Sequence, residues 1–264
     1  MSEKPQRGKA LNPDGANYGD LPKILLEVLT TKRVFARDGT THPLESNVSY
    51  SEALELYTAA RYLRPEFSVE IGLAHGVSAL AILAGVAANG MGHHYLIDPL
   101  QSNYGYCGET MIQRAGYHDL HTFLEQFPEE ALPALPPIKF AFIDSSHLFD
   151  LTLLEFVLID KKLEVGGVVA LHDTWMPSIQ AVLRFVLANR AYEMCRDFSL
   201  RKPRLCLRQR WKYIVARCLN KIPAAERIFG SNILLPWSTF QIGNLVFLRK
   251  LSNDQRDWRY YQRF

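Results

Sequence analysis

The sequence lacks the marks of several specialised classes of protein. Only four of its 264 residues are cysteine, and no two of them have the C-x-x-C spacing of a zinc or redox motif. No run of about 18 apolar residues could span a bilayer, and residues 1–20 are polar, without the apolar core of a signal peptide. These absences favour a reducing compartment, and we expect a cytoplasmic protein.

A strong imbalance of charge is also missing. The formal net charge is +3 and the sequence pI is about 8.6, so we expect no nucleic-acid partner. The chain is 48% hydrophobic and 22% charged, which suits one large α/β domain with an apolar core, or one domain with an appendage.

One stretch, residues 68–78, combines three features that organise the chain. A short apolar run predicts a buried strand, two glycines follow at positions 72 and 76, and a helix of small residues is predicted over 77–88. Strand, glycine turn and helix form the nucleotide-binding corner of doubly wound α/β sheets. Glycine lets a backbone approach a ligand closely, and the helix N-terminus offers free N–H groups.

The spacing of the glycines argues against two common nucleotide sites. A dinucleotide fingerprint needs G-x-G-x-x-G, but Ala74 stands at the second glycine, and no Gly-Lys-Ser/Thr completes a P-loop. The stretch closely resembles motif I of the class I S-adenosylmethionine-dependent methyltransferases. The resemblance implies that the methionine half of the cofactor is held by Glu70, Gly72, Leu73, Ala74, Gly76 and Ser78. The alternative is a strand–helix corner that binds nothing.

Strands and helices alternate after this corner, which predicts a doubly wound, mostly parallel sheet. We expect the strands at residues 68–71, 93–98, 118–124, 139–144 and 168–172. Helices are expected at 148–161, with Leu151, Leu154, Val157 and Leu158 facing inward, and at 178–190. By resemblance to the class I methyltransferases the sheet has seven strands, and the last, 241–250, lies antiparallel at its edge.

The chain is expected to divide into two parts after residue 48. Residues 1–48 are expected to form a leader with one helix at 21–32 and a loop at 33–48, and residues 49–264 the methyltransferase domain. Ser49 and Glu52 have the Ser-x-x-Glu spacing of a capping box, which predicts a helix that runs to about Leu63.

A long insertion, residues 199–240, precedes the last predicted strand. Its basic part, 199–227, places Leu207, Trp211, Ile214, Val215, Cys218 and Ile222 on one helical face. We expect a helical cap that covers the acceptor site or contacts a second copy of the chain. A basic amphipathic helix could instead make weak contact with an anionic membrane surface.

Two acidic residues follow strands on the cofactor side. Asp98 ends the predicted strand 93–98, where a carboxylate can accept hydrogen bonds from the hydroxyls of a ribose; it could instead cap the turn before Pro99. Glu125 follows the predicted strand 118–124, in a stretch similar to the segment that borders the adenine in small-molecule O-methyltransferases. The alternative for this stretch is an ordinary start of a helix.

A second group of polar residues stands at the ends of two later strands. Asp144 ends the strand 139–144 with His147 just beyond it, and His172 and Asp173 follow the strand 168–172. Neighbouring parallel strands lie about 4.8 Å apart, so these residues should converge beside the cofactor. Two carboxylates and an imidazole favour a shared divalent cation, and His147 could take a proton from a hydroxyl.

The Asp-x-x-His pattern with a polar pair after the next strand resembles the metal-dependent O-methyltransferases that tailor antibiotics and macrolide sugars. The resemblance implies that Asp144, His172 and Asp173 hold Mg2+ or another divalent cation, that His147 is the base, and that Asp144 also borders the cofactor. His172 departs from the family, which carries an acid there. Packing and helix capping are the structural alternatives for these residues.

We therefore expect a Rossmann-like methyltransferase that methylates a hydroxyl of a sugar, phenol or natural product. Two other functions are compatible with the same fold. An NAD(P)-dependent oxidoreductase would need the missing third glycine, and a non-catalytic nucleotide-binding or membrane-surface scaffold would use the basic segment 199–227.

Overall fold

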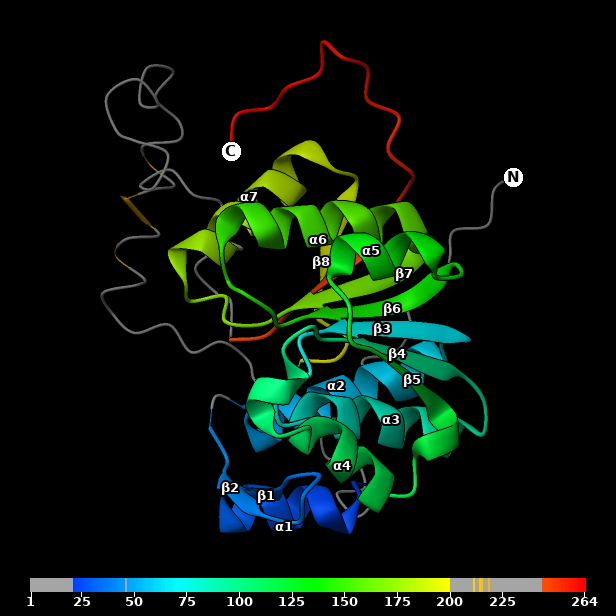
Figure 1. Cartoon of the computed structure of the whole chain (residues 1–264). Coiled ribbons are helices and arrows are strands. Elements are labelled where there is room, and N and C mark those ends of the chain that lie inside the picture. The colour runs from blue at the N-terminus through cyan, green and yellow to red at the C-terminus, as the bar shows by residue number, and fades with distance from the viewer. Residues whose placement is uncertain (1–20, 46, 200–210, 212–213, 216–217, 219–243) are drawn as a thin grey trace.

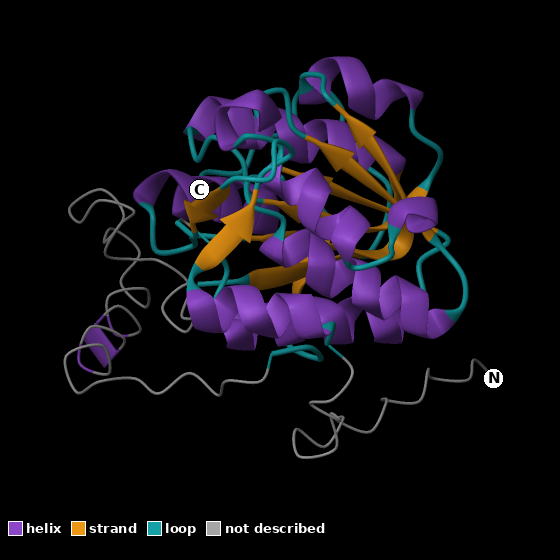
Figure 2. Ribbon diagram, turned by 60° about the horizontal axis from the view of Figure 1, so that its bottom comes forward, coloured by secondary structure: helices purple, strands orange, loops and turns teal. Residues whose placement is uncertain are grey.

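The computed structural model describes residues 21–45, 47–199, 211, 214–215, 218 and 244–264. Its centre is a seven-stranded sheet with helices on both faces (Figures 1 and 2). From edge to edge the strands are β5 (His121–Leu124), β4 (His93–Ile97), β3 (Phe67–Ile71), β6 (Ile138–Ile143), β7 (Leu163–Leu171), β9 (Val246–Lys250) and β8 (Tyr192–Cys195).

The helices form one layer on each face of the sheet (Figure 1). One layer holds α1 (Lys23–Thr31), α2 (Tyr50–Leu63), α3 (Val77–Asn89) and α4 (Cys107–Arg114). The other holds α5 (Pro128–Ala131), α6 (Phe149–Lys162) and α7 (Pro177–Asn189). Short 3-10 helices lie at Gln101–Tyr104, His118–Leu120 and Leu132–Ala134.

Alternate residues of the central strands pack into two apolar cores, one on each face of the sheet, as the two-residue period of a strand requires. Phe140 and Phe142 of β6 are fully buried on the side of α1–α4, whereas Ala141 and Ile143 pack on the side of α5–α7. A strand buried on both faces reads as a continuous apolar run, which is why the central strands were predictable.

The pairing confirms the predicted doubly wound, mostly parallel sheet of seven strands. Strands β5, β4, β3, β6 and β7 pair in parallel, and β9 pairs antiparallel with both β7 and β8. The prediction that the last strand lies at the edge is wrong, because β8 occupies that edge. With four residues and a mixed pattern of burial, β8 carries too weak a signal to be predicted.

The predicted loop at residues 33–48 contains a β-hairpin, β1 (Arg33–Phe35) and β2 (Thr41–Pro43). Val34 of this hairpin is fully buried in the same core as Leu25 of α1 and Leu80 of α3. Residue 48 is therefore no boundary of the apolar core, because described residues between 21 and 45 pack in it.

The predicted capping box begins α2. The Ser49 hydroxyl accepts a hydrogen bond from the Glu52 backbone N–H at 3.4 Å, and the Ser49 N–H donates to Glu52 Oε2 at 2.6 Å. These reciprocal bonds satisfy backbone donors that a helix start leaves unpaired.

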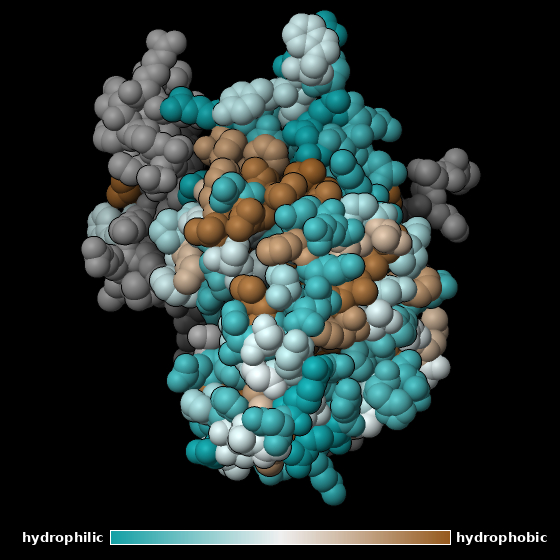
Figure 3. Space-filling view, viewed as in Figure 1, coloured by the Kyte–Doolittle hydropathy of each residue, from teal (hydrophilic) through white to brown (hydrophobic). Residues whose placement is uncertain are grey.

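The buried face of α6 differs from the prediction. Leu151 and Leu154 are exposed, and Figure 3 shows an apolar patch over this helix. The buried face holds Phe156, Ile159 and the polar Glu155. Val157 and Leu158 are half-buried against the same core, as predicted. The buried positions follow the spacing of a helix face, but with a different phase from the one predicted. The carboxyl group of Glu155 accepts from the Ser145 hydroxyl at 2.6 and 2.7 Å, so this buried polar group has a partner.

The predicted cap at 199–240 lies largely outside the described residues. Four members of its apolar face, Trp211, Ile214, Val215 and Cys218, are described as helical, and their side chains are exposed. In the described part of the chain, no helix has both the length and the apolar character needed to cross a bilayer.

Candidate active site

The glycine turn after β3 is packed against backbone from two other segments. Gly72 has a φ of 91°, and a Cβ there would lie 2.1 Å from the carbonyl oxygen of Asp144. Gly76 has a φ of 79°, and a Cβ there would lie 2.8 Å from the Cα of Gly108 in α4. Both glycines are thus required for contact between backbones, and Gly108 is a partner that the sequence pattern did not reveal.

Asp98 braces this turn from the end of β4. Its Oδ2 accepts hydrogen bonds from the N–H groups of Leu73 (3.1 Å) and Ala74 (3.0 Å) and from the Gln101 amide (2.9 Å), and its Oδ1 accepts from the Leu100 N–H (2.9 Å). A carboxylate has about four acceptor positions, so all are engaged. The predicted roles of Asp98, Leu73 and Ala74 as cofactor contacts stay predictions; here these groups bind one another.

Glu70 is fully buried beneath the turn. Its Oε1 accepts a short hydrogen bond from the Ser78 hydroxyl, and its Oε2 lies 3.3 Å from Nε2 of His94, which is also fully buried. The Nδ1 of His94 lies 2.9 Å from the Ser68 hydroxyl. Burial raises the pKa of Glu70 well above its usual value and lowers the pKa of His94 to about 3. The pair therefore carries one proton, which bridges two neutral groups.

Glu125 lies at the exposed end of β5, beside the loop that follows β4. Its Oε1 accepts a hydrogen bond from the Tyr106 hydroxyl at 2.9 Å. The guanidinium of Arg37, from the N-terminal hairpin, lies 3.6 Å from the centre of the Tyr106 ring. The assignment of Glu125 to the adenine stays a prediction.

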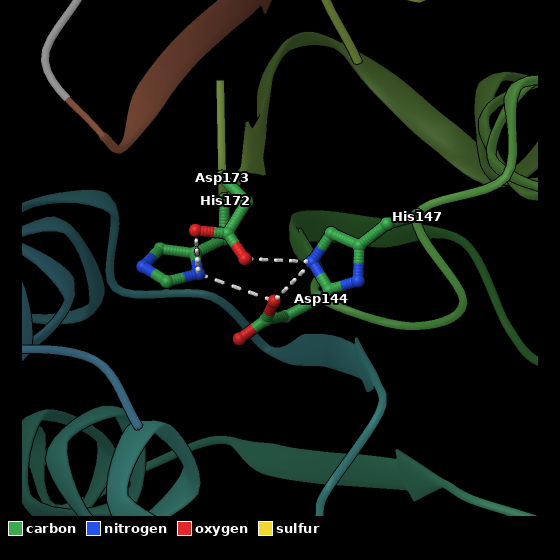
Figure 4. A group of neighbouring side chains, drawn as sticks. All are labelled: Asp144, His147, His172 and Asp173. Carbon is green, nitrogen blue, oxygen red and sulfur yellow. Dashed lines mark hydrogen bonds and ion pairs between the residues drawn. The ribbon is translucent and has the colours of Figure 1, made fainter. Parts of the chain in front are cut away.

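The four residues predicted at the ends of the next two strands do come together (Figure 4). One ligand-type atom from each of Asp144, His147, His172 and Asp173 lies within 4.8 Å of those of the others. Asp144 ends β6, and its backbone N–H donates to the Ile71 carbonyl oxygen at 2.9 Å, so the cluster directly adjoins the glycine turn.

His147 lies between the two carboxylates of this cluster. Its Nε2 is 3.2 Å from Asp144 Oδ1 and 3.1 Å from Asp173 Oδ2. Neither contact has the angles of a hydrogen bond, so this buried nitrogen has charged neighbours but no hydrogen-bond partner. The contact with the Asp144 side chain raises the pKa of His147 above its usual value. His147 and Asp173 both have left-handed backbones, with φ of 58° and 50°, a strain often found at functional sites.

His172 is the most buried member of the cluster. Its Nδ1 lies 3.2 Å from Asp144 Oδ1, and its Nε2 lies 2.9 Å from the Asn244 amide and 3.6 Å from Glu52 Oε2. Burial alone would lower the pKa of His172, but the contacts with Asp144 and Glu52 raise it to about 10. Burial likewise opposes ionisation of Glu52, but His172 and Ser49 lower the pKa of that carboxyl to about 2.

The cluster fits a divalent cation by its spacing and its chemistry. An ion with bonds of about 2.1 Å separates adjacent ligand atoms by roughly 3.0–3.4 Å. The Nε2 of His147 lies 3.2 Å from Asp144 Oδ1 and 3.1 Å from Asp173 Oδ2, and His172 Nδ1 lies 3.2 and 3.7 Å from the same two carboxylates. Imidazole with carboxylate suits Mn2+, Fe2+ or Zn2+ better than Mg2+, which prefers oxygen ligands alone.

Three neighbours of the cluster were not predicted from the sequence. Glu52 was identified only as a helix cap, and Asn244 lies before β9 in a stretch with no motif. Trp175 is 64% exposed and donates from Nε1 to Asp173 Oδ1 at 2.9 Å. A tryptophan two residues after a predicted ligand was the one signal available for it.

The order of the strands, the glycine turn and the polar cluster at the strand ends define the class I methyltransferase fold. In agreement, residues 69–174 match a family described as a methyltransferase domain. The chain is a methyltransferase, as the sequence predicted, and the oxidoreductase alternative finds no support. A search of curated proteins found no match.

Solved structures with similar folds carry related descriptions. Cofactor-bound Rv0187 from MTB is 15% identical, with a TM-score of 0.54 over 72% of this chain and 90% of that one. The O-methyltransferase TomG from Streptomyces achromogenes, solved with SAM, is 18% identical, with a TM-score of 0.52 over 66% and 81%. An O-methyltransferase from Bacillus cereus, solved with SAH, is 16% identical, with a TM-score of 0.53 over 69% and 86%. At these identities the likeness establishes the fold.

Proposed function

We propose that this methyltransferase transfers the methyl group of S-adenosylmethionine to a hydroxyl oxygen of a small molecule. The observation that carries the proposal is the cluster of Asp144, His147, His172 and Asp173 directly beside the glycine turn. The cofactors named for TomG and the Bacillus cereus enzyme, and the description of both as O-methyltransferases, support the same reaction.

In this proposal the cofactor lies over the turn at the ends of β3 and β4. Its methionine half contacts the residues of motif I, from Glu70 to Ser78, and its ribose and adenine lie toward Asp98 and Glu125. Because the Asp98 carboxylate already accepts four N–H groups, its first contribution is to hold the turn in shape. A cofactor that hydrogen-bonds Asp98 must exchange with one of those donors.

Asp144, His172 and Asp173 would hold the divalent cation. When bound, such a cation makes a hydroxyl that coordinates it more acidic. His147 is the base in this account, because its side chain is 26% exposed, more than the side chains of the other three.

The acceptor, the partners and the location belong to the same proposal. A formal net charge of only +3 and a polar cluster at the ends of two strands suit a small hydroxylated acceptor, with no nucleic acid. We infer that the 199–240 segment covers the acceptor or contacts a second copy of the chain. Three described cysteines, Cys107, Cys195 and Cys218, are free, in keeping with a reducing, cytoplasmic setting.

The test is calorimetric titration of the full chain with S-adenosylmethionine, S-adenosylhomocysteine and NAD. We expect micromolar binding of the first two and no binding of NAD. Tight binding of NAD, or no binding of S-adenosylmethionine, would contradict the proposed cofactor.

A further inference from the structure

Glu52 belongs to two structures at once. Its backbone and side chain complete the capping box of α2, and the same Oε2 that accepts from the Ser49 N–H lies 3.6 Å from His172 Nε2. The first turn of α2 therefore reaches the cluster at the ends of β6 and β7. Only 14% of the Glu52 side chain is exposed, so solvent screens this contact little.

The two nitrogens of His172 face different surroundings. Nδ1 faces the proposed ligands, 3.2 Å from Asp144 Oδ1 and 3.7 Å from Asp173 Oδ1. Nε2 faces away from them, toward Glu52 and the Asn244 amide. A histidine that binds a metal through one nitrogen commonly donates its other N–H to a carboxylate or carbonyl oxygen, which fixes the tautomer and the orientation of the ring.

The amide of Asn244 fits this arrangement when its oxygen faces the ring. Its Nδ2 stands 2.9 Å from His172 Nε2, while its Oδ1 is buried with no partner. The two ends of an amide have nearly the same shape, so hydrogen bonding decides their assignment. With the ends exchanged, Oδ1 accepts from the Nε2–H of His172. The Glu52 carboxylate then adds negative charge behind the same N–H.

We propose that Glu52 is a positioning residue of the cation site: with the Asn244 amide it holds the Nε2 proton of His172 and presents the Nδ1 lone pair to the cation. This inference rests on the proposed cation site. In this proposal the capping box does more than start a helix, because the position of α2 determines whether His172 is oriented to bind the cation. A neutral imidazole supplies no negative charge, and the carboxylate behind it makes the ring a better donor to a cation.

The experiment measures the affinity of the full chain for Mn2+ by calorimetry, together with the shift that Mn2+ causes in the melting temperature. Glu52→Gln is the main variant, because glutamine still accepts at the capping position but carries no charge. We expect it to weaken Mn2+ binding about 10–100-fold. Ser49→Ala is the matched control, since it removes the other half of the capping box and leaves the Glu52 carboxylate in place. It should lower the melting temperature of the metal-free chain and leave Mn2+ affinity within about twofold.

Asp173→Asn separates this inference from the cation site itself. If it abolishes Mn2+ binding while Glu52→Gln binds like the wild type, the role of Glu52 is overturned and the site remains. If the wild type binds no Mn2+, both are overturned. A second measurement needs no variant: 1H–15N correlation spectra of the Zn2+-loaded chain report the tautomer of His172. We expect a proton on Nε2 and none on Nδ1, and the reverse tautomer would overturn the proposal.

Discussion

Gly72 and Asp144 lie in backbone contact, so close that a Cβ on Gly72 would come within 2.1 Å of the Asp144 carbonyl oxygen. This contact joins the turn predicted to bind the cofactor to the first residue of the polar cluster. A movement of either segment must displace the other, so the proposed cofactor site and the polar cluster are held in one frame. Positioning of the two reactants is the main contribution that such a frame makes to a transfer reaction.

The contact predicts the effect of Gly72→Ala. The added Cβ meets both an unfavourable φ of 91° and the Asp144 carbonyl, so the unfolding free energy should fall by more than about 3 kcal/mol. Gly39→Ala is the control, because Gly39 has a φ of 87° with nothing within 4 Å of a new Cβ. It should cost only the backbone strain, about 1–2 kcal/mol. Denaturant unfolding measures both, and equal losses would show that the Gly72 contact is unimportant.

Asp98→Ala should destabilise the chain before any cofactor is added. Four N–H donors lose their acceptor, and three of them belong to the backbone of the turn and of the loop after β4. We expect a loss of about 1–3 kcal/mol in the unfolding free energy, and weaker binding of S-adenosylmethionine as the turn loosens. A role limited to the ribose would weaken binding and leave the stability of the cofactor-free chain unchanged. Thermal and denaturant unfolding without cofactor distinguish the two.

The buried pair of Glu70 and His94 predicts a particular dependence of stability on pH. When unfolded, the pair holds two protons below pH 4.5, one between 4.5 and 6.5, and none above 6.5. When folded it keeps one proton from about pH 3 up to the raised pKa of Glu70, because the pKa of His94 is lowered and that of Glu70 is raised. Its contribution should therefore be constant between pH 4.5 and 6.5 and decline on either side. The decline above 6.5 should approach about 1.4 kcal/mol per pH unit.

Glu70→Gln provides the comparison for this profile. Glutamine cannot titrate, so the decline above pH 6.5 should disappear. Only His94 then gains a proton on unfolding, so the contribution of the site should fall as the pH drops below 6.5. The free energy of unfolding, measured from pH 4 to pH 8 for both proteins, gives the difference. Parallel curves would show that the pair holds no shared proton.

His147→Ala tests the assignment of the base. We expect the rate of methyl transfer to fall about 10²–10⁴-fold, with little change in the affinity for S-adenosylmethionine. Mn2+ affinity should stay near the wild-type value, since three proposed ligands remain. A large loss of Mn2+ affinity would instead make His147 a ligand, because a nitrogen bound to the cation cannot take the acceptor's proton.

The parts of the fold that could be predicted are those with a strong local signal. The apolar runs of β3 and β6 lie in the doubly buried centre of the sheet, and Ser49 and Glu52 form the capping box that their spacing indicated. The hairpin β1–β2 and the edge strand β8 have three or four residues each, too few for a period to appear. The pairing of β8 also depends on β9, which is distant in the sequence.

The residues of the candidate site likewise fall into those that the sequence predicted and those that it did not. Asp144, His172 and Asp173 end strands, so the topology alone brings them together. The position of His147 between two carboxylates depends on a left-handed backbone at that residue, which no pattern predicted. Glu52 and Asn244 reach His172 from α2 and from the start of β9, and only the packed structure shows that these segments meet.

The most direct measurement follows the methyl group itself. The full chain, with Mn2+ added, is incubated with S-adenosylmethionine labelled in its methyl carbon and with the small-molecule extract of its source cells. The account predicts a labelled small molecule whose new methyl group is bonded to oxygen, formed by the wild type and greatly reduced in Asp173→Asn. Label bonded to nitrogen or carbon, label in protein or nucleic acid, or no transfer in any fraction would contradict it.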